Sequence, residues 1–360
     1  MKILDRYIVK QYLWTILFSL VAFTALFTVV DLMEKLDDFI DRDAPATLVA
    51  KYYLVFIPDI LKLMTPVAAL FGSLFTAGKM GNQMEITAIK AGGVSFYRFM
   101  VPIVAVSTLI SAFSIYFGGY FVPDMNKHKL HIERVNLKKH LNVAGANLFF
   151  QDGDRRLVRV GYYNPNTGEA VRASVQEFAD DDLTVMTVRH DLQRMRYDSA
   201  SGEWIGVNGV WRKFDERGEE YRLFVNDTLR QLGFMPDELA TKQQRVEEMT
   251  LDELSERIES RRRAGHDPTR LVIEYHARFA FAFTPIVVVL FGLPLSANRR
   301  KSGLALQFGI NTLIAFLYLG MMQIIQAFGK NGSLDPLLTA WLVNIIFLVG
   351  AAVNLARVRN

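Results

Sequence analysis

The chain has 360 residues, of which 51% are hydrophobic, and it carries a formal net charge of +4 at pH 7. It contains no cysteine, which excludes disulfides, thiolate nucleophiles and cysteine-ligated metal sites. Apolar residues are concentrated towards both ends, around a charged middle, so the composition indicates a membrane protein. The small positive charge gives no reason to expect nucleic-acid binding.

The apolar segments are long enough to cross a bilayer, because a membrane-spanning helix needs about 20 apolar residues. Uncharged runs occur at 11–30, 99–123, 279–298, 302–329 and 336–356. A sixth run, 52–78, contains Asp59 and Lys62, which either pair and face a cavity or lie near the outer interface. The pattern predicts six transmembrane helices, three on each side of the charged middle.

Basic residues predict the orientation of these helices. Lysine and arginine gather in the segments that a six-span topology places on one side, which are 2–10, 79–98, 299–301 and 357–359. The loop after the first span is instead rich in aspartate. Because cytoplasmic loops carry the excess of basic residues, we expect both termini in the cytoplasm and the charged middle outside.

A short polar stretch, KMGNQMEITAIKAGG at 79–93, separates the second and third spans. Helical spacing places Met84, Ala88 and Ala91 on one face, and the glycine pair 92–93 ends the helix. Methionine adapts to irregular surfaces, and the carboxylate of Glu85 can accept two bonds from an arginine. The stretch therefore favours a helix that docks in a protein groove, and an amphipathic helix on the lipid headgroups is the alternative.

The charged middle, from about 124 to 270, alternates between turn signals and short segments with period-two hydrophobicity, such as 171–176 and 221–226. This pattern predicts an antiparallel β sandwich or open barrel large enough to bury its own core. Thr250 and Glu253 then form a capping box that starts a helix. That helix either couples the outer domain to the spans or is a plain connector.

Two stretches resemble phosphate-binding or metal-binding motifs but lack residues that these motifs require. The stretch 72–80 resembles a phosphate-binding loop, but its glycines are spaced too widely and Met80 stands where a hydroxyl is required. His128 and His131 are spaced for a shared metal on a helix, but no further ligand follows at a diagnostic distance. We therefore expect no catalytic residue and no bound metal.

Several segments together resemble the lipopolysaccharide-export permease family, LptF and LptG, over nearly the whole chain. They are LDRYIVKQYL at 4–13, PVAALFGSLFTAGKM at 66–80, QMEITAIKAGGVS at 83–95 and the segment from LDELSERIES to FGLPLS at 251–296. The LDRYIVK opening leans toward LptG. The resemblance implies an α-helical membrane protein with six transmembrane helices (3+3) and an inserted periplasmic antiparallel β domain that is jellyroll-like. The implied domains are spans one to three with a coupling helix at about 80–91 (1–123), the periplasmic β domain (124–249), a periplasmic connector helix (250–270) and spans four to six (271–360).

The resemblance also implies a function. Such a chain is the permease subunit of an ABC-type exporter that extracts lipopolysaccharide from the bacterial inner membrane and passes it to a periplasmic bridge. The implied partners are an LptB-like ATPase dimer, a paralogous LptF/LptG-type permease, and LptC- and LptA-like bridge proteins. The chain itself would bind no cofactor, because ATP and Mg are used by the ATPase. The alternatives are a scaffold or force-transmitting subunit without its own substrate cavity and a lipid-modifying membrane enzyme.

The family's functional positions can be carried over to this sequence. The implied ATPase-coupling residues are Met84, Glu85, Ile86, Ala88 and Gly92. The chemistry of the residues gives the candidates for the substrate cavity, Phe27, Lys35, Lys62 and Arg278, which would supply an apolar wall and cations for an anionic glycolipid. Lys62 has no secure counterpart in the family. Lys35 lies in the family's substrate-facing stretch, although its acidic neighbours depart from the basic cluster expected there.

Overall fold

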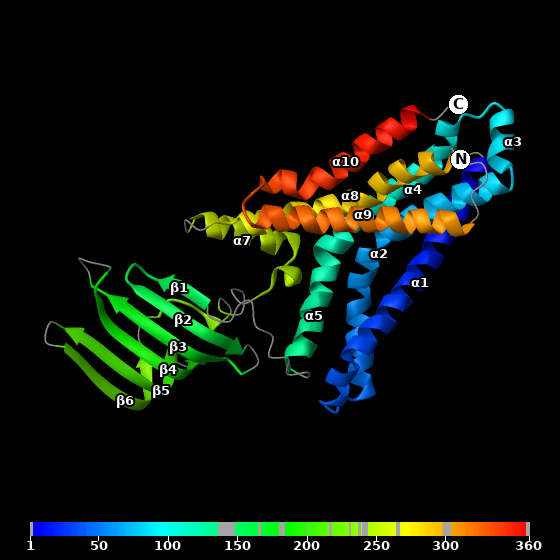
Figure 1. Ribbon diagram of the computed structural model, residues 1–360. Coiled ribbons are helices and arrows are strands. Elements are labelled where there is room, and N and C mark those ends of the chain that lie inside the picture. Colours follow the sequence, from blue (N-terminus) through cyan, green and yellow to red (C-terminus); the bar gives the residue numbers. More distant parts are fainter. Residues whose placement is uncertain are drawn as a thin grey trace. The chain divides into compact units, whose positions relative to one another are not determined.

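The computed structural model describes residues 3–135, 148–164, 167–179, 184–199, 201–215, 218–229, 232–236, 239, 244–263, 267–297 and 304–357. The chain forms two compact units (Figure 1). The membrane unit comprises Met1–Lys138 and Val246–Asn360, and the β unit comprises Lys139–Arg245.

The described part of the membrane unit contains six helices that are long and apolar enough to cross a bilayer, which confirms the predicted 3+3 arrangement. Its elements are α1 (Ile3–Ile40), α2 (Ala46–Asn82), α3 (Glu85–Ala91), α4 (Phe96–Tyr116), the π-helical turn η1 (Phe117–Phe121), α5 (Val122–Val135), the 3₁₀ turn η2 (Val246–Glu248), α7 (Leu251–Arg263), α8 (Thr269–Ala297), α9 (Leu304–Lys330) and α10 (Pro336–Ala356). The elements α4, η1 and α5 continue as one helical span, which extends beyond the boundary at 124 predicted for the β domain.

A buried tyrosine connects the helices within each half of the membrane unit. The hydroxyl of Tyr12 in α1 lies 2.8 Å from Ser107 Oγ in α4 and donates to the Ala69 carbonyl of α2 at 3.3 Å. The hydroxyl of Tyr318 in α9 lies 2.7 Å from Thr284 Oγ1 in α8 and donates to Asn344 Oδ1 in α10 at 2.5 Å. Hydrogen bonds between helices are worth roughly 1 kcal/mol each in a bilayer, so each half is held by directional bonds as well as by packing.

The β unit contains one six-stranded antiparallel sheet in the sequential order β1-β2-β3-β4-β5-β6, which confirms the predicted antiparallel domain and gives its strand order. The strands are β1 (Leu148–Asp152), β2 (Arg156–Asn164), β3 (Glu169–Phe178), β4 (Met186–Asp198), β5 (Glu203–Asp215) and β6 (Gly218–Leu229). Trp204 is fully buried in the core, where its indole N–H donates to the Phe234 carbonyl at 3.0 Å. Phe234 and Leu239, which follow β6, thus pack against the core of the sheet.

Two non-glycine residues in this sheet have a left-handed backbone, Arg172 in β3 (φ 54°) and Asn208 in β5 (φ 50°). Along β3, the buried apolar residues change from a spacing of two, at Ala173 and Val175, to a spacing of three, at Ala170. The alternation of apolar side chains therefore shifts by one residue at Arg172, while the pairing with β2 keeps its register, with Val160 opposite Ala173 and Tyr162 opposite Val171. This shift positions the arginine at the cavity described below.

The predicted capping box starts α7. The Thr250 N–H donates to Glu253 Oε2 at 2.8 Å, and the Glu253 N–H donates back to Thr250 Oγ1 at 3.3 Å. Asp267 starts α8 in a similar way, because its carboxylate accepts a bond from the Thr269 N–H at 2.9 Å. The sequence predicts that α7 ends near Gly265, because glycine is common just past a helix C-terminus, and this residue lies outside the described residues.

Candidate functional site

The short helix α3 presents an exposed surface next to the N-terminal end of α1 (Figure 1). Met84, immediately before the helix, has a left-handed backbone (φ 62°), and 65% of its surface is exposed. Ala88 and Gly92 are also exposed, whereas Ile86 packs against the apolar core of the membrane unit. A strained, exposed methionine is unusual for a plain loop, because such backbone conformations cost of order 1–3 kcal/mol and cluster at functional sites.

Glu85 is held by a neighbour from the start of α1. The Tyr7 hydroxyl lies 3.2 Å from both oxygens of the Glu85 carboxylate. Close by, Asp5 and Arg98 form a salt bridge of 2.7 Å between α1 and α4. The structure therefore brings the acidic residue of the predicted coupling helix to a surface that also includes the ends of α1 and α4.

A cavity of about 470 Å³ lies among α1, α2, α8 and α9. Three of the four predicted cavity residues line it, namely Phe27, Lys62 and Arg278. Carboxylates line it as well, at Asp31, Glu34, Asp59 and Glu274. The cavity thus combines an apolar wall with charges of both signs.

Lys62 and Asp59 do not form the ion pair that their spacing allows. Asp59 Oδ2 instead lies 3.7 Å from Lys129 Nζ in α5. The aliphatic part of Lys62 packs beside Gly118 of the π-turn, where an added Cβ would lie 3.5 Å from Lys62 Cδ. Packing of the Lys62 side chain against the third span therefore fixes the position of its ammonium group at the cavity. A charge at membrane depth is costly unless a group of opposite charge or a polar partner lies near it.

Lys35 lies outside the cavity lining, in a cluster between α1, α2 and α5. Its ammonium nitrogen is 3.0 Å from Asp31 Oδ1 and 3.7 Å from Glu133 Oε1, and it donates to the Tyr52 hydroxyl. Tyr52 in turn donates to Glu133 at 3.0 Å, and the Phe56 ring lies 5.1 Å from the ammonium. The ammonium group thus has two close partners, Asp31 and Tyr52, and a longer ionic contact with Glu133.

Arg278 lines the cavity, but two of its nitrogens are directed to the backbone. Nη1 donates to the Met249 carbonyl at 2.5 Å, and Nη2 donates to the Val246 carbonyl at 2.7 Å. The carbonyls belong to the turn that precedes α7, so part of the arginine's hydrogen-bonding capacity is used to hold the chain. This role has no local sequence signal, because the partners lie 29 and 32 residues away.

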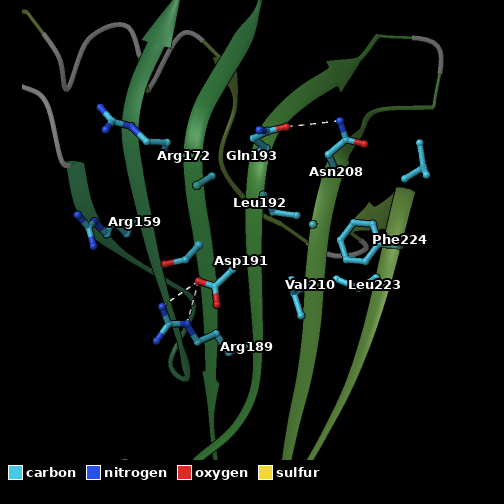
Figure 2. A pocket seen from close by; sticks show the side chains of 14 residues that line it. Arg159, Arg172, Arg189, Asp191, Leu192, Gln193, Asn208, Val210, Leu223 and Phe224 are labelled. Atoms are coloured by element: carbon cyan, nitrogen blue, oxygen red, sulfur yellow. Dashed lines mark hydrogen bonds and ion pairs between the residues drawn. The ribbon is translucent and has the colours of Figure 1, made fainter.

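A second cavity, of about 910 Å³, lies on one face of the β unit (Figure 2). Arg159, Arg172 and Arg189 line one side, where Asp191 pairs with Arg189 at 2.8 Å. The other side includes Leu223, Phe224 and Val225 of the edge strand β6, of which Leu223 is 74% exposed. No sequence pattern indicates this amphipathic cavity. The alternation at 221–226 predicts a strand, but its apolar residues Tyr221, Leu223 and Val225 are exposed.

A family model described as "Lipopolysaccharide export system permease LptF/LptG" matches residues 6–357. The chain belongs to the LptF/LptG family. It is similar to the lipopolysaccharide export system permease protein LptF of Escherichia coli (strain K12), with 24% identity over 362 residues that cover 98% of this chain and 94% of that protein. It is also similar to LptG of the same strain, with 28% identity over 189 residues that cover 44% of this chain and 52% of that protein.

Membership of the LptF/LptG family agrees with the architecture of the chain. Six apolar helices with a sheet inserted between the third and the fourth match the arrangement of this permease family. The chain is therefore a multi-pass protein of the inner membrane and a permease subunit, not an enzyme in the catalytic sense. The lean toward LptG stays a prediction, because relatives of both types match.

Proposed function

We propose that this chain is the lipid-handling permease subunit of a lipopolysaccharide exporter that extracts the glycolipid from the inner membrane. The observation that carries the proposal is the family match over residues 6–357, which includes every element of the membrane unit that lines the cavity. An anionic glycolipid requires an apolar wall for acyl chains and cations for phosphates. The cavity that contains Phe27, Lys62 and Arg278 offers both.

The energy for export would come from a separate ATPase. In this proposal an LptB-like ATPase dimer binds ATP and Mg and contacts α3, with Glu85 accepting an arginine of the ATPase and Met84 and Ala88 filling a shallow groove. This arrangement requires α3 and both termini to be cytoplasmic, as the distribution of basic residues predicts. The exposure of Met84 and the position of Glu85 at the protein surface support it.

The proposed export complex includes further partners. A second, paralogous LptF/LptG-type permease would pair with this chain, and LptC- and LptA-like proteins would receive the lipid in the periplasm. The amphipathic cavity of the β unit, with Arg172 on one side and Leu223 on the other, suits contact with a lipid that carries both phosphates and acyl chains. The chain itself would bind no cofactor.

A photo-crosslinking experiment tests the proposal. A photoreactive amino acid at Phe27, which lines the cavity, should form adducts with lipopolysaccharide in living cells. Phe18 on the same helix is a matched control, because it is 74% exposed and is not part of the cavity lining. Adducts at Phe27 that depend on an active ATPase support transport, whereas adducts with protein alone at both positions would favour the scaffold.

A further inference from the structure

The chain returns from the β unit to the membrane unit through residues 246–254, here called the return segment. It comprises η2 and the first turn of α7. On one side it is held by Arg278 of the fourth span, whose two bonds to the Val246 and Met249 carbonyls measure 2.7 and 2.5 Å. A planar guanidinium can satisfy two separate carbonyls at once, which a single ammonium does less well.

The third span holds the same segment from its other side. Lys127 pairs with Glu253 at 2.8 Å, and the Tyr120 hydroxyl donates to Asp252 Oδ1 at 3.2 Å. Burial opposes ionisation of Glu253, but the bonds from Lys127 and from the Thr250 backbone outweigh it and lower the pKa of this carboxyl. Glu253 is therefore a carboxylate at neutral pH, so the contact between the third span and α7 is a true ion pair.

The π-turn in the third span makes room for the return segment. A Cβ added at Gly119 would lie 2.5 Å from Leu251 Cδ1 and 2.9 Å from Leu251 Cγ, so any larger residue would force the Leu251 side chain to move. A glycine in a helix costs up to about 1 kcal/mol relative to alanine, and π-turns are frequent at functional sites. Its neighbour Gly118 has no such contact with α7, because its nearest atoms belong to Lys62 at 3.5 Å.

We infer that the return segment is a fixed anchor between the third and fourth spans, and that Arg278 is the positioning residue which holds it there. The anchor would make α7 a coupling element rather than a plain connector. Any force carried along the chain between residues 245 and 246 then acts on two spans together. The role of the anchor in export rests on the proposed function, but its existence does not.

A glycine exchange tests the close approach, with the assembled exporter in detergent for the exchange measurement and in proteoliposomes for the release measurement. Gly119→Ala should increase hydrogen–deuterium exchange of residues 246–254 about tenfold and lower ATP-driven release of lipopolysaccharide from proteoliposomes, because overpacking displaces Leu251. Gly118→Ala is the matched control. It should change the hydrogen–deuterium exchange of residues 246–254 and the release of lipopolysaccharide less than Gly119→Ala does. Leu251→Ala added to Gly119→Ala should restore slower exchange, since it removes the clashing atoms.

An arginine exchange separates positioning from substrate binding. Arg278→Lys keeps the charge but cannot hold both carbonyls, so exchange of residues 246–254 should rise about 10- to 100-fold, as expected when bonds to a charged group are lost. Export should fall with it. Unchanged exchange in Arg278→Lys would overturn the positioning role.

The two proposals fail in different ways. The exchange measurement needs no substrate, so it tests the anchor even if the exporter releases no lipopolysaccharide. If the wild-type exporter is active and Gly119→Ala matches Gly118→Ala in exchange and in release, the anchor is refuted and the proposed export function stands. If the wild-type complex releases no lipopolysaccharide while the exchange results hold, the proposed function is refuted instead.

Discussion

Replacing Lys35 by methionine should destabilise the membrane unit without touching a substrate. The change removes all three donors of the ammonium group and leaves Glu133, whose side chain is 10% exposed, with its bond from Tyr52. Removing one partner of a buried ion pair costs about 3–5 kcal/mol. Because the Lys35 side chain keeps 18% of its exposure, we expect the low end of this range, about 3 kcal/mol.

The assay is thermal unfolding of the purified exporter, with Lys51→Met, an exposed lysine of α2, as the control. Adding Glu133→Gln to Lys35→Met should recover most of the loss, because it removes the unpaired buried charge. The reasoning would be refuted if Lys35→Met melted like the wild type but lost lipopolysaccharide adducts at Phe27. That result would assign the lysine to the substrate, as its place in the sequence had suggested.

Three further predictions concern the two units. Glu85→Lys should abolish capture of the ATPase in co-purification and leave the melting temperature unchanged, and normal capture would exclude the coupling role. Asn208→Ala should destabilise the β unit by about 1 kcal/mol, measured by faster exchange in β5, because alanine adopts φ 50° only with strain whereas asparagine tolerates it. Burial lowers the pKa of His190 despite the carboxylates of Glu177 and Asp227. Around and below pH 6.5 the unfolded chain therefore binds more protons than the folded chain. The β unit should lose stability as the pH falls through this range, and a melting temperature that does not change with pH up to neutrality would contradict this.

The sequence predicts features that depend on neighbouring residues. The six spans follow from the length of apolar runs, and the capping box at Thr250 follows from a spacing of three residues. The β domain follows from period-two alternation between turn signals, which is a local property of each strand. The exposure of Ala88 and Ala91 on α3 also agrees with their helical spacing, whereas Met84 precedes the helix.

Contacts between distant segments could not be predicted in this way. Asp59 and Lys62 are spaced for a pair, yet Asp59 pairs with Lys129, because the third span brings a cation from 70 residues further along the chain. The environment of Lys35 likewise depends on Tyr52 and Glu133, which tertiary packing places beside it. Long-range partners of charged side chains depend on how helices pack, and a single sequence does not encode that packing in a readable pattern.

The two buried tyrosines have a consequence for motion in the membrane unit. Tyr12 forms hydrogen bonds that join α1, α2 and α4, and Tyr318 forms hydrogen bonds that join α8, α9 and α10. The helices within each group of three therefore resist sliding past one another. Between the groups, Gly292 meets Leu70, where an added Cβ would lie 2.7 Å away, and such apolar packing has no preferred direction. Directional bonds join the groups near the ends of their helices. Arg278 and Lys127 hold residues 246–254, and the Tyr97 hydroxyl of α4 donates to the Leu355 carbonyl of α10 at 3.2 Å. Between these bonded ends, apolar packing along the helices leaves small sliding movements open to the two groups.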